Sequence, residues 1–142
     1  MKIIVHELMS DGLQQELTPE RNMIVEAIRP RLYRHNFATG SLKMQVIDGS
    51  NAVVAESETI QIADIGSAAF FHGHVRFQLN AGLKKGQPYS FKLIGFNGYG
   101  FSETAYIGWC NGYDLGKYEA SYSPASTLTY PLDIEIWERT SK

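Results

Sequence analysis

The sequence predicts an all-β protein: a two-layer antiparallel β-sandwich of the jelly-roll type, formed as a single domain over residues 1–142. The first observation is the alternation of apolar and polar side chains with a period of two, which places successive side chains on opposite faces of a strand. The second is the regular appearance of turn-forming residues between these alternating segments. The third is the length of 142 residues, which is typical of one domain and suffices for a core without disulfides or a structural metal.

Composition and charge exclude several classes of protein. Apolar residues are 44% of the chain and charged residues 20%, which is typical of a folded domain. The net charge of -2 provides no positive field to concentrate nucleic acid or anionic lipid. A single cysteine, Cys110, excludes an intrachain disulfide. No segment approaches the ~20 apolar residues of a membrane-spanning helix, and Glu7 and Asp11 interrupt any signal-peptide core. We therefore expect synthesis in a cytoplasm and no membrane or nucleic-acid partner.

The N-terminal third begins with a segment, residues 1–17, that we expect to add a strand to the sandwich or to reach a neighbouring molecule. Residues 18–22 predict a turn, followed by a strand. The alternative is a helix over residues 18–27, which Pro19 could start. The β-branched residues of that segment and the nearby Pro30 favour the strand.

Alternation predicts the later strands, in which one set of apolar side chains faces the core. These side chains are Leu42, Met44 and Val46; Ile60 and Ile62; Phe71, Val75, Phe77 and Leu79; Tyr89, Phe91 and Leu93; and Leu132, Ile134 and Ile136. Turn-forming residues stand at 48–51, 84–86, 97–100 and 111–112. The chain thus predicts about eight or nine short strands, which is typical of a sandwich.

Residues 111–130 differ from the rest because they lack clear alternation and contain four tyrosines: Tyr113, Tyr118, Tyr122 and Tyr130. We predict a long tyrosine-rich loop, which is uncommon in a compact domain unless it binds something. Tyrosine is frequent at interfaces because its ring offers a large contact area with a polar tip. The loop could pack on its own sandwich, contact another protein or contact a ligand.

Strand parity predicts different environments for the two tryptophans. Trp109 has the parity of Ile107, so we expect it in the core. Trp137 has the parity of Glu135 and opposes that of Ile136, so we expect it to face outward. Trp137 is therefore the first candidate for an interface anchor.

A basic cluster and an acidic pair are further candidates for contact residues. Arg29 and Arg31 share a strand face, whereas Arg34 has the opposite parity. These guanidinium groups could bind carboxylates of a neighbouring subunit, or could be solvated. Asp133 and Glu135 share a face of the last strand, where we expect them to discourage edge-to-edge aggregation.

Several residue patterns could form a metal-binding or catalytic site, but each also has a structural interpretation, which we favour. His72 and His74 could share a metal ion with a third ligand, or could be part of a polar strand face. Asp48, Ser50 and Asn51 could bind calcium, or could shape a hairpin turn. Cys110 lies in an apolar strand, where a buried thiol is usual. Neither a G-x-S-x-G elbow nor a P-loop occurs. We predict no catalytic residues, no metal and no cofactor.

The order of features between residues 28 and 109 carries a resemblance. It runs IRPRLYRHNFATGSLKMQVIDGSNAVVAESETI, then VRFQLNAGLKKGQPYSFKLIGF, then SETAYIGW. This order resembles the β-sandwich jelly rolls of the galactose-binding-like group and of small bacteriophage virion proteins. Among the latter it most resembles head-decoration (cement) or fibre-associated modules.

The resemblance implies a non-enzymatic, multi-copy structural protein that is located in the virion and made in the host cytoplasm. The implied partners are the major capsid protein or a fibre, and other copies of the chain, for which a trimer is one plausible arrangement. The carbohydrate-binding relatives imply an alternative: a carbohydrate-binding module of a receptor-binding apparatus or a glycan-acting protein, often with calcium. No ligand residue of either group can be matched onto this chain.

Overall fold

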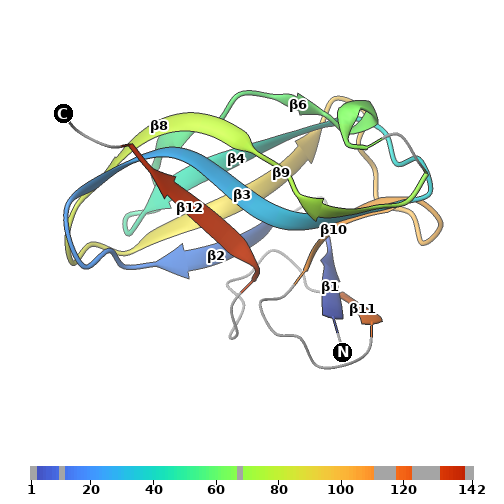
Figure 1. Cartoon of the computed structure of the whole chain (residues 1–142), viewed down its shortest axis with the longest axis horizontal. Coiled ribbons are helices and arrows are strands. Elements are labelled where there is room, and N and C mark those ends of the chain that lie inside the picture. The colour runs from blue at the N-terminus through green and yellow to red at the C-terminus, as the bar shows by residue number, and fades with distance from the viewer. Residues whose placement is uncertain (1–2, 10–11, 67–68, 111–117, 123–131, 140–142) are drawn as a thin grey trace.

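The computed structural model describes residues 3–9, 12–66, 69–110, 118–122 and 132–139. Within these residues the chain forms twelve strands and one short 3-10 helix, and the strands make two sheets around a main core (Figure 1). This confirms the predicted all-β, two-layer antiparallel sandwich. No helix in the described part of the chain is long and apolar enough to span a membrane.

The strands follow one another with short connections. They are β1 (Ile3–Glu7), β2 (Leu13–Leu17), β3 (Met23–His35), β4 (Ser41–Asp48), β5 (Val53–Glu56), β6 (Ile60–Gln61), β7 (Phe71–His74), β8 (Phe77–Leu83), β9 (Tyr89–Phe96), β10 (Tyr106–Cys110), β11 (Tyr118–Tyr122) and β12 (Ile134–Glu138). The 3-10 helix η1 (Ile62–Asp64) follows β6. The predicted turn at residues 18–22 is confirmed, because β2 ends at Leu17 and β3 begins at Met23.

The seven-stranded sheet is built on β3, a strand of 13 residues that is long enough to pair with two strands on each side. On one side lie β10 and β12, which pair with the second and first halves of β3 respectively. On the other side lie β7 and β8. Beyond β10 the sheet continues with β1 and then β11, which runs parallel to β1. Figure 1 shows β1 and β11 side by side, and β12 alongside β3.

The five-stranded sheet has the order β2-β9-β4-β5, with β6 also paired to β4. Its centre is the long antiparallel pair β4–β9, in register from Ser41 opposite Phe96 to Asp48 opposite Tyr89. Residues 1–17 therefore supply one strand to each sheet: β1 joins the seven-stranded sheet and β2 joins this one.

The core lies between the two sheets and consists largely of the side chains that alternation predicts. Leu42, Met44, Val46, Phe91 and Leu93 are fully buried. The other predicted apolar positions are buried or pack half-buried against the same cluster. The parity predictions for these strands are therefore confirmed.

Residues 71–79, predicted as one strand, form two, because the ladder along β3 is interrupted between β7 and β8. Opposite the interruption lies Pro30, whose carbonyl accepts a hydrogen bond from the Val75 amide (3.0 Å). A residue's carbonyl and amide point to the same side of an antiparallel strand, and proline has no N–H to donate. The missing donor accounts for the break.

Residues 111–130, predicted as a loop, include a strand: residues 118–122 form β11. Cys110 and Asp133, on either side of this segment, lie next to each other, because the Asp133 amide donates a hydrogen bond to the Cys110 carbonyl (2.8 Å). The strands β10 and β12 thus lie end to end along β3.

Tyr99 follows β9 of the five-stranded sheet, and its hydroxyl bonds to the seven-stranded sheet at β10 and at the residue after β1. Its hydroxyl donates to the Leu8 carbonyl (2.6 Å) and accepts from the Ile107 amide (3.2 Å). Burial raises the pKa of Tyr99 to about 12. Two glycines, Gly40 and Gly95, lie so close to Tyr99 that neither position has room for a Cβ atom. Sequence patterns indicated only a turn at this tyrosine.

Candidate functional site

The most distinctive surface is the outward side of β3 and β12, which we call the β3–β12 face. Core-facing residues on these strands, such as Ile28 and Ile136, alternate with charged and aromatic residues, which therefore point away from the core. The face consists of Glu26, Arg29, Arg31, His74, Arg76, Asp133, Glu135 and Trp137.

Two ion pairs run across β3 and β12. Arg29 Nη1 donates to Glu135 Oε1 at 2.7 Å, and these residues are direct partners in the antiparallel register. Arg31 Nη1 donates to Asp133 Oδ2 at 3.5 Å. All four side chains are partly exposed, so the pairs orient one another while remaining accessible from outside.

His74 adds a third group to this network. Its Nε2 lies 3.0 Å from Asp133 Oδ1 and 3.9 Å from Glu135 Oε2. The neighbouring His72 is more exposed, and partial burial together with the Arg31 guanidinium lowers the pKa of its imidazole. Within the described ranges no three His, Cys, Asp or Glu side chains are grouped so as to hold a metal ion. The contacts of His74 with Asp133 and Glu135 make it part of the side-chain network on this face.

Trp137 lies at the end of the β3–β12 face and is 44% exposed, which confirms its predicted outward orientation. The guanidinium carbons of Arg29 and Arg76 lie 5.5 and 5.1 Å from the centre of its ring system, within the range of cation–π attraction. Its indole Nε1 donates to Glu135 Oε1 at 3.1 Å. Arg76 in turn pairs with Glu26 at 3.6 Å. The exposed ring is thus held in one orientation.

The carboxylate of Glu135 is the centre of these contacts. The hydrogen bond from Trp137, together with nearby His74 and Arg29, lowers the pKa of Glu135. Glu135 therefore remains ionised at neutral pH and keeps the negative charge on which these contacts depend.

Asp133 is fixed by its backbone as well as by its side chain. Its carbonyl accepts hydrogen bonds from the Arg31 amide (3.0 Å) and from Trp109 Nε1 (2.9 Å). Trp109 is fully buried, as parity predicted, so the indole connects the core to the base of the face. Adjacent Cys110 is also buried, and this burial raises the pKa of its thiol to about 12.

The sequence analysis named Asp133 and Glu135 but missed their pairing with Arg31 and Arg29. The signal was present: two acids and two arginines each stand at positions i and i+2, and equal spacing allows two strands to pair them one to one. The pairing nevertheless joins residues that are far apart in the sequence: Arg31 and Asp133 are 102 positions apart, and Arg29 and Glu135 are 106 positions apart.

The other predicted interface residues lie elsewhere. Arg34 is 3% exposed, and its Nη1 donates to the Ile62 carbonyl at 2.8 Å, so it lies at the end of the core and not on the surface. Tyr118 and Tyr122 are the first and last residues of β11. Tyr113 and Tyr130 lie outside the described residues.

Farther along β3, the outward side chains become aromatic. The Tyr33 hydroxyl lies 2.9 Å from His35 Nδ1, and the His35 ring stacks on Tyr106 with a centroid distance of 4.9 Å. Phe70 meets the same imidazole edge to face. Phe70 and the nearby Phe37 are exposed, Phe37 to 63%. Sequence parity did not group these rings, because they come from three separate parts of the chain.

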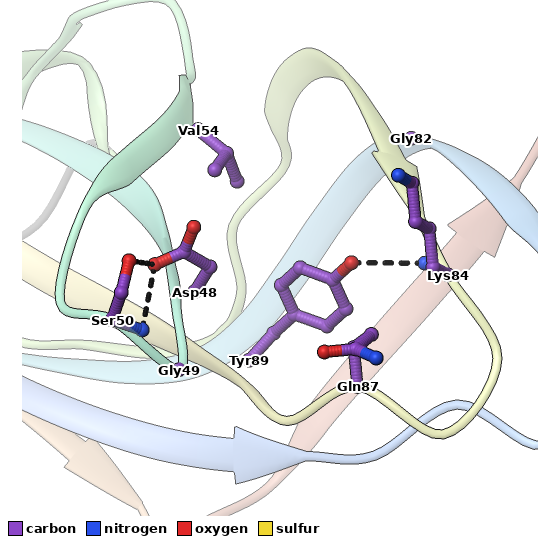
Figure 2. Close-up of a pocket in the computed structure, with 8 residues that line it drawn as sticks. All are labelled: Asp48, Gly49, Ser50, Val54, Gly82, Lys84, Gln87 and Tyr89. Atoms are coloured by element: carbon purple, nitrogen blue, oxygen red, sulfur yellow. Dashed lines mark hydrogen bonds between the residues drawn. The ribbon is translucent and has the colours of Figure 1, made fainter.

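A hollow of about 580 Å³ lies at the end of the sandwich where two turns approach each other (Figure 2). Its lining residues are Asp48, Gly49, Ser50, Val54, Gly82, Lys84, Gln87 and Tyr89. Figure 2 shows that much of the polar lining is engaged within the turns. Asp48 Oδ1 accepts from the amides of Ser50 and Ala52 (2.9 and 3.0 Å) and from the Ser50 hydroxyl (2.7 Å). The structural interpretation of this turn is confirmed.

Comparisons with family profiles, with curated proteins and with solved structures find no match for this chain. What the β3–β12 face can do therefore follows from its own chemistry. A fixed aromatic ring, guanidinium donors and carboxylates on an open sheet surface are groups of the kinds that occur at protein–protein interfaces.

Proposed function

We propose that the protein is a non-enzymatic structural component of a bacteriophage virion, which decorates or cements the capsid or attaches to a fibre through protein–protein contacts. The observation that carries the proposal is Trp137: a large, exposed ring that two arginines and one glutamate hold in place on an open sheet face.

Trp137 has the properties of an interface anchor. Tryptophan and arginine are the residues that most often dominate the free energy of protein association. A side chain that is already held in one rotamer loses less conformational entropy on binding than a free one. Repetition of such a contact over many copies in a particle raises its effective concentration, so a modest affinity per copy suffices.

The virion part of the proposal is supported by the resemblance between residues 28–109 and head-decoration or fibre-associated modules. An all-β sandwich is the fold that this resemblance implies. The proposed location is the virion, after synthesis in the host cytoplasm.

The arrangement around Trp137 favours a protein partner over a carbohydrate. Sugars bind aromatic side chains by stacking a pyranose face on the ring, and here the guanidinium groups of Arg29 and Arg76 already lie over it. Those same groups can bind carboxylates of a protein partner with paired hydrogen bonds.

The test is to purify particles produced by the host that carries the gene, and to quantify the protein in them by mass spectrometry. We expect many copies per particle. Particles stripped of the protein should bind the purified wild type, and should bind Trp137→Ala at least about tenfold more weakly. Phe37→Ala is the matched control, because it removes an exposed ring outside the β3–β12 face.

Two results would contradict the proposal: absence of the protein from purified particles, or equal binding by wild type and Trp137→Ala. Glycan-array binding that Trp137→Ala abolishes would favour the carbohydrate function instead.

A further inference from the structure

The charges of the β3–β12 face are sorted into two columns. On β12 and the residue before it, the outward side chains are acidic: Asp133 and Glu135. On β3, at the same level along the strands, they are basic: Arg31 and Arg29. An acidic column therefore lies directly beside a basic column.

Such a pattern is complementary to itself under one particular symmetry. Consider a second copy placed face to face, related by a two-fold axis that runs parallel to the strands between the columns. That rotation exchanges the columns, so the acidic column of each copy lies over the basic column of the other. A two-fold axis perpendicular to the strands would instead place acid over acid and base over base. The charges therefore favour the first axis and oppose the second.

We propose that the β3–β12 face binds the same face of a second copy of this chain in an isologous, two-fold dimer, with Arg29 of each copy opposite Glu135 of the other. This inference rests on the proposed function, in which the same face is a protein contact. It names a neighbouring copy of the chain as the partner at that face and a two-fold axis as the symmetry. Sequence resemblance suggested a homo-oligomer with a trimer as one arrangement; the two columns favour a dimer.

The side chains have the capacity for these additional contacts. A guanidinium group carries five N–H donors, and the bond from Arg29 to Glu135 uses one of them. A carboxylate can accept several hydrogen bonds. Both side chains are partly exposed, so a second copy can reach them.

Trp137 reinforces the arrangement. Because the axis runs parallel to the strands, the two copies of Trp137 lie at the same level along them, on opposite sides of the axis. The dimer would therefore place two large rings beside the exchanged ion pairs, and the cover that they provide would strengthen those pairs by excluding water.

The experiment is a charge-exchange series followed by analytical ultracentrifugation. Wild type should show a monomer–dimer equilibrium at concentrations up to about 100 μM, because dimer population follows mass action. Arg29→Glu places two acids opposite each other twice in one dimer, and Glu135→Arg does the same with two bases. Each variant alone should raise the dimer dissociation constant at least about tenfold.

Mixing the two variants is the decisive part of the experiment. A heterodimer of Arg29→Glu with Glu135→Arg pairs unlike charges at both sites, so the mixture should recover dimers that neither variant forms alone. Lys43→Glu is the matched control: it breaks a similarly exposed ion pair, Lys43 with Glu56 at 3.1 Å, on the other sheet, and should leave dimerisation unchanged.

The inference would be overturned if the wild type stays monomeric throughout, or if neither charge reversal weakens the dimer. It would also be overturned if the mixture fails to form dimers although each variant keeps the wild-type melting transition. Failure of the proposed function is a separate result: protein that dimerises through this face but is absent from particles. Protein that is present in particles but never dimerises retains the proposed function and removes this inference.

Discussion

The contact between Gly95 and Tyr99 makes a sharp prediction about stability. A Cβ atom built on Gly95 would lie 2.5 Å from Cδ2 and 2.7 Å from Cγ of the Tyr99 ring. The ring cannot withdraw freely, since its hydroxyl is bonded to the Leu8 carbonyl and the Ile107 amide. Gly95→Ala should therefore displace the ring and weaken these two hydrogen bonds.

The magnitude follows from these two effects. Overpacking by one methyl group costs ~1–3 kcal/mol, and weakening the two hydrogen bonds without breaking them costs about a further 1 kcal/mol in total. We expect Gly95→Ala to lower the free energy of unfolding by ~2–4 kcal/mol. Gly82→Ala is the matched control, because Gly82 is also a strand glycine and no atom lies within 4 Å of its added Cβ. That change should be neutral or stabilise the fold by up to ~1 kcal/mol.

The assay is equilibrium unfolding in denaturant, comparing transition midpoints at equal slope. A second measurement isolates the cause: in a Tyr99→Ala background the ring is gone, so Gly95→Ala should cost much less than it does in the wild type. Equal stability of Gly95→Ala and Gly82→Ala would refute the close packing of Tyr99. So would an unchanged cost of Gly95→Ala after the ring is removed.

Three further predictions follow from other parts of the structure. Because burial raises the pKa of Cys110 to about 12, a thiol reagent at pH 8 should label the native protein far more slowly than the unfolded protein, and equal labelling rates would contradict this burial. Trp109→Phe removes the indole donor to the Asp133 carbonyl and should lower the free energy of unfolding by ~1–2 kcal/mol in denaturant titrations; an unchanged midpoint would argue against that bond. Hydrogen bonds from the Ala52 amide and the Ser50 hydroxyl lower the pKa of Asp48 in the folded protein. The ionised Asp48 side chain therefore stabilises the fold fully above the unfolded-state pKa of about 4, and this stabilisation is lost as the pH falls through the lower pKa of the folded state. The free energy of unfolding of Asp48→Asn should therefore fall less steeply than that of wild type as the pH is lowered. The same pH dependence in both proteins would contradict this role of Asp48.

The sequence predicted the features that depend on local order. Whether a side chain faces the core or the solvent follows from position along one strand, which is why the orientations of Phe91, Trp109 and Trp137 were predictable. The Asp48 turn was predictable for the same reason, since its hydrogen bonds join residues within four positions of one another.

The remaining features depend on which strands become neighbours, and one sequence does not specify that. The break between β7 and β8 follows from Pro30, which lies on a different strand some 45 positions earlier. The Arg29–Glu135 pair exists because β12 joins β3 across 106 positions of chain. The burial of Arg34 required the position of η1, whose Ile62 carbonyl accepts its hydrogen bond.

The measurement that most directly tests the central claim, that the β3–β12 face is a protein contact in the assembled particle, is hydroxyl-radical footprinting. Free protein, diluted until it is monomeric, and intact particles would be oxidised in parallel, and the modification rate of each exposed ring would be determined by mass spectrometry. We predict that Trp137, which is 44% exposed in the free chain, becomes strongly protected in the particle relative to Phe37. Equal oxidation of Trp137 in the free and assembled protein would contradict the account.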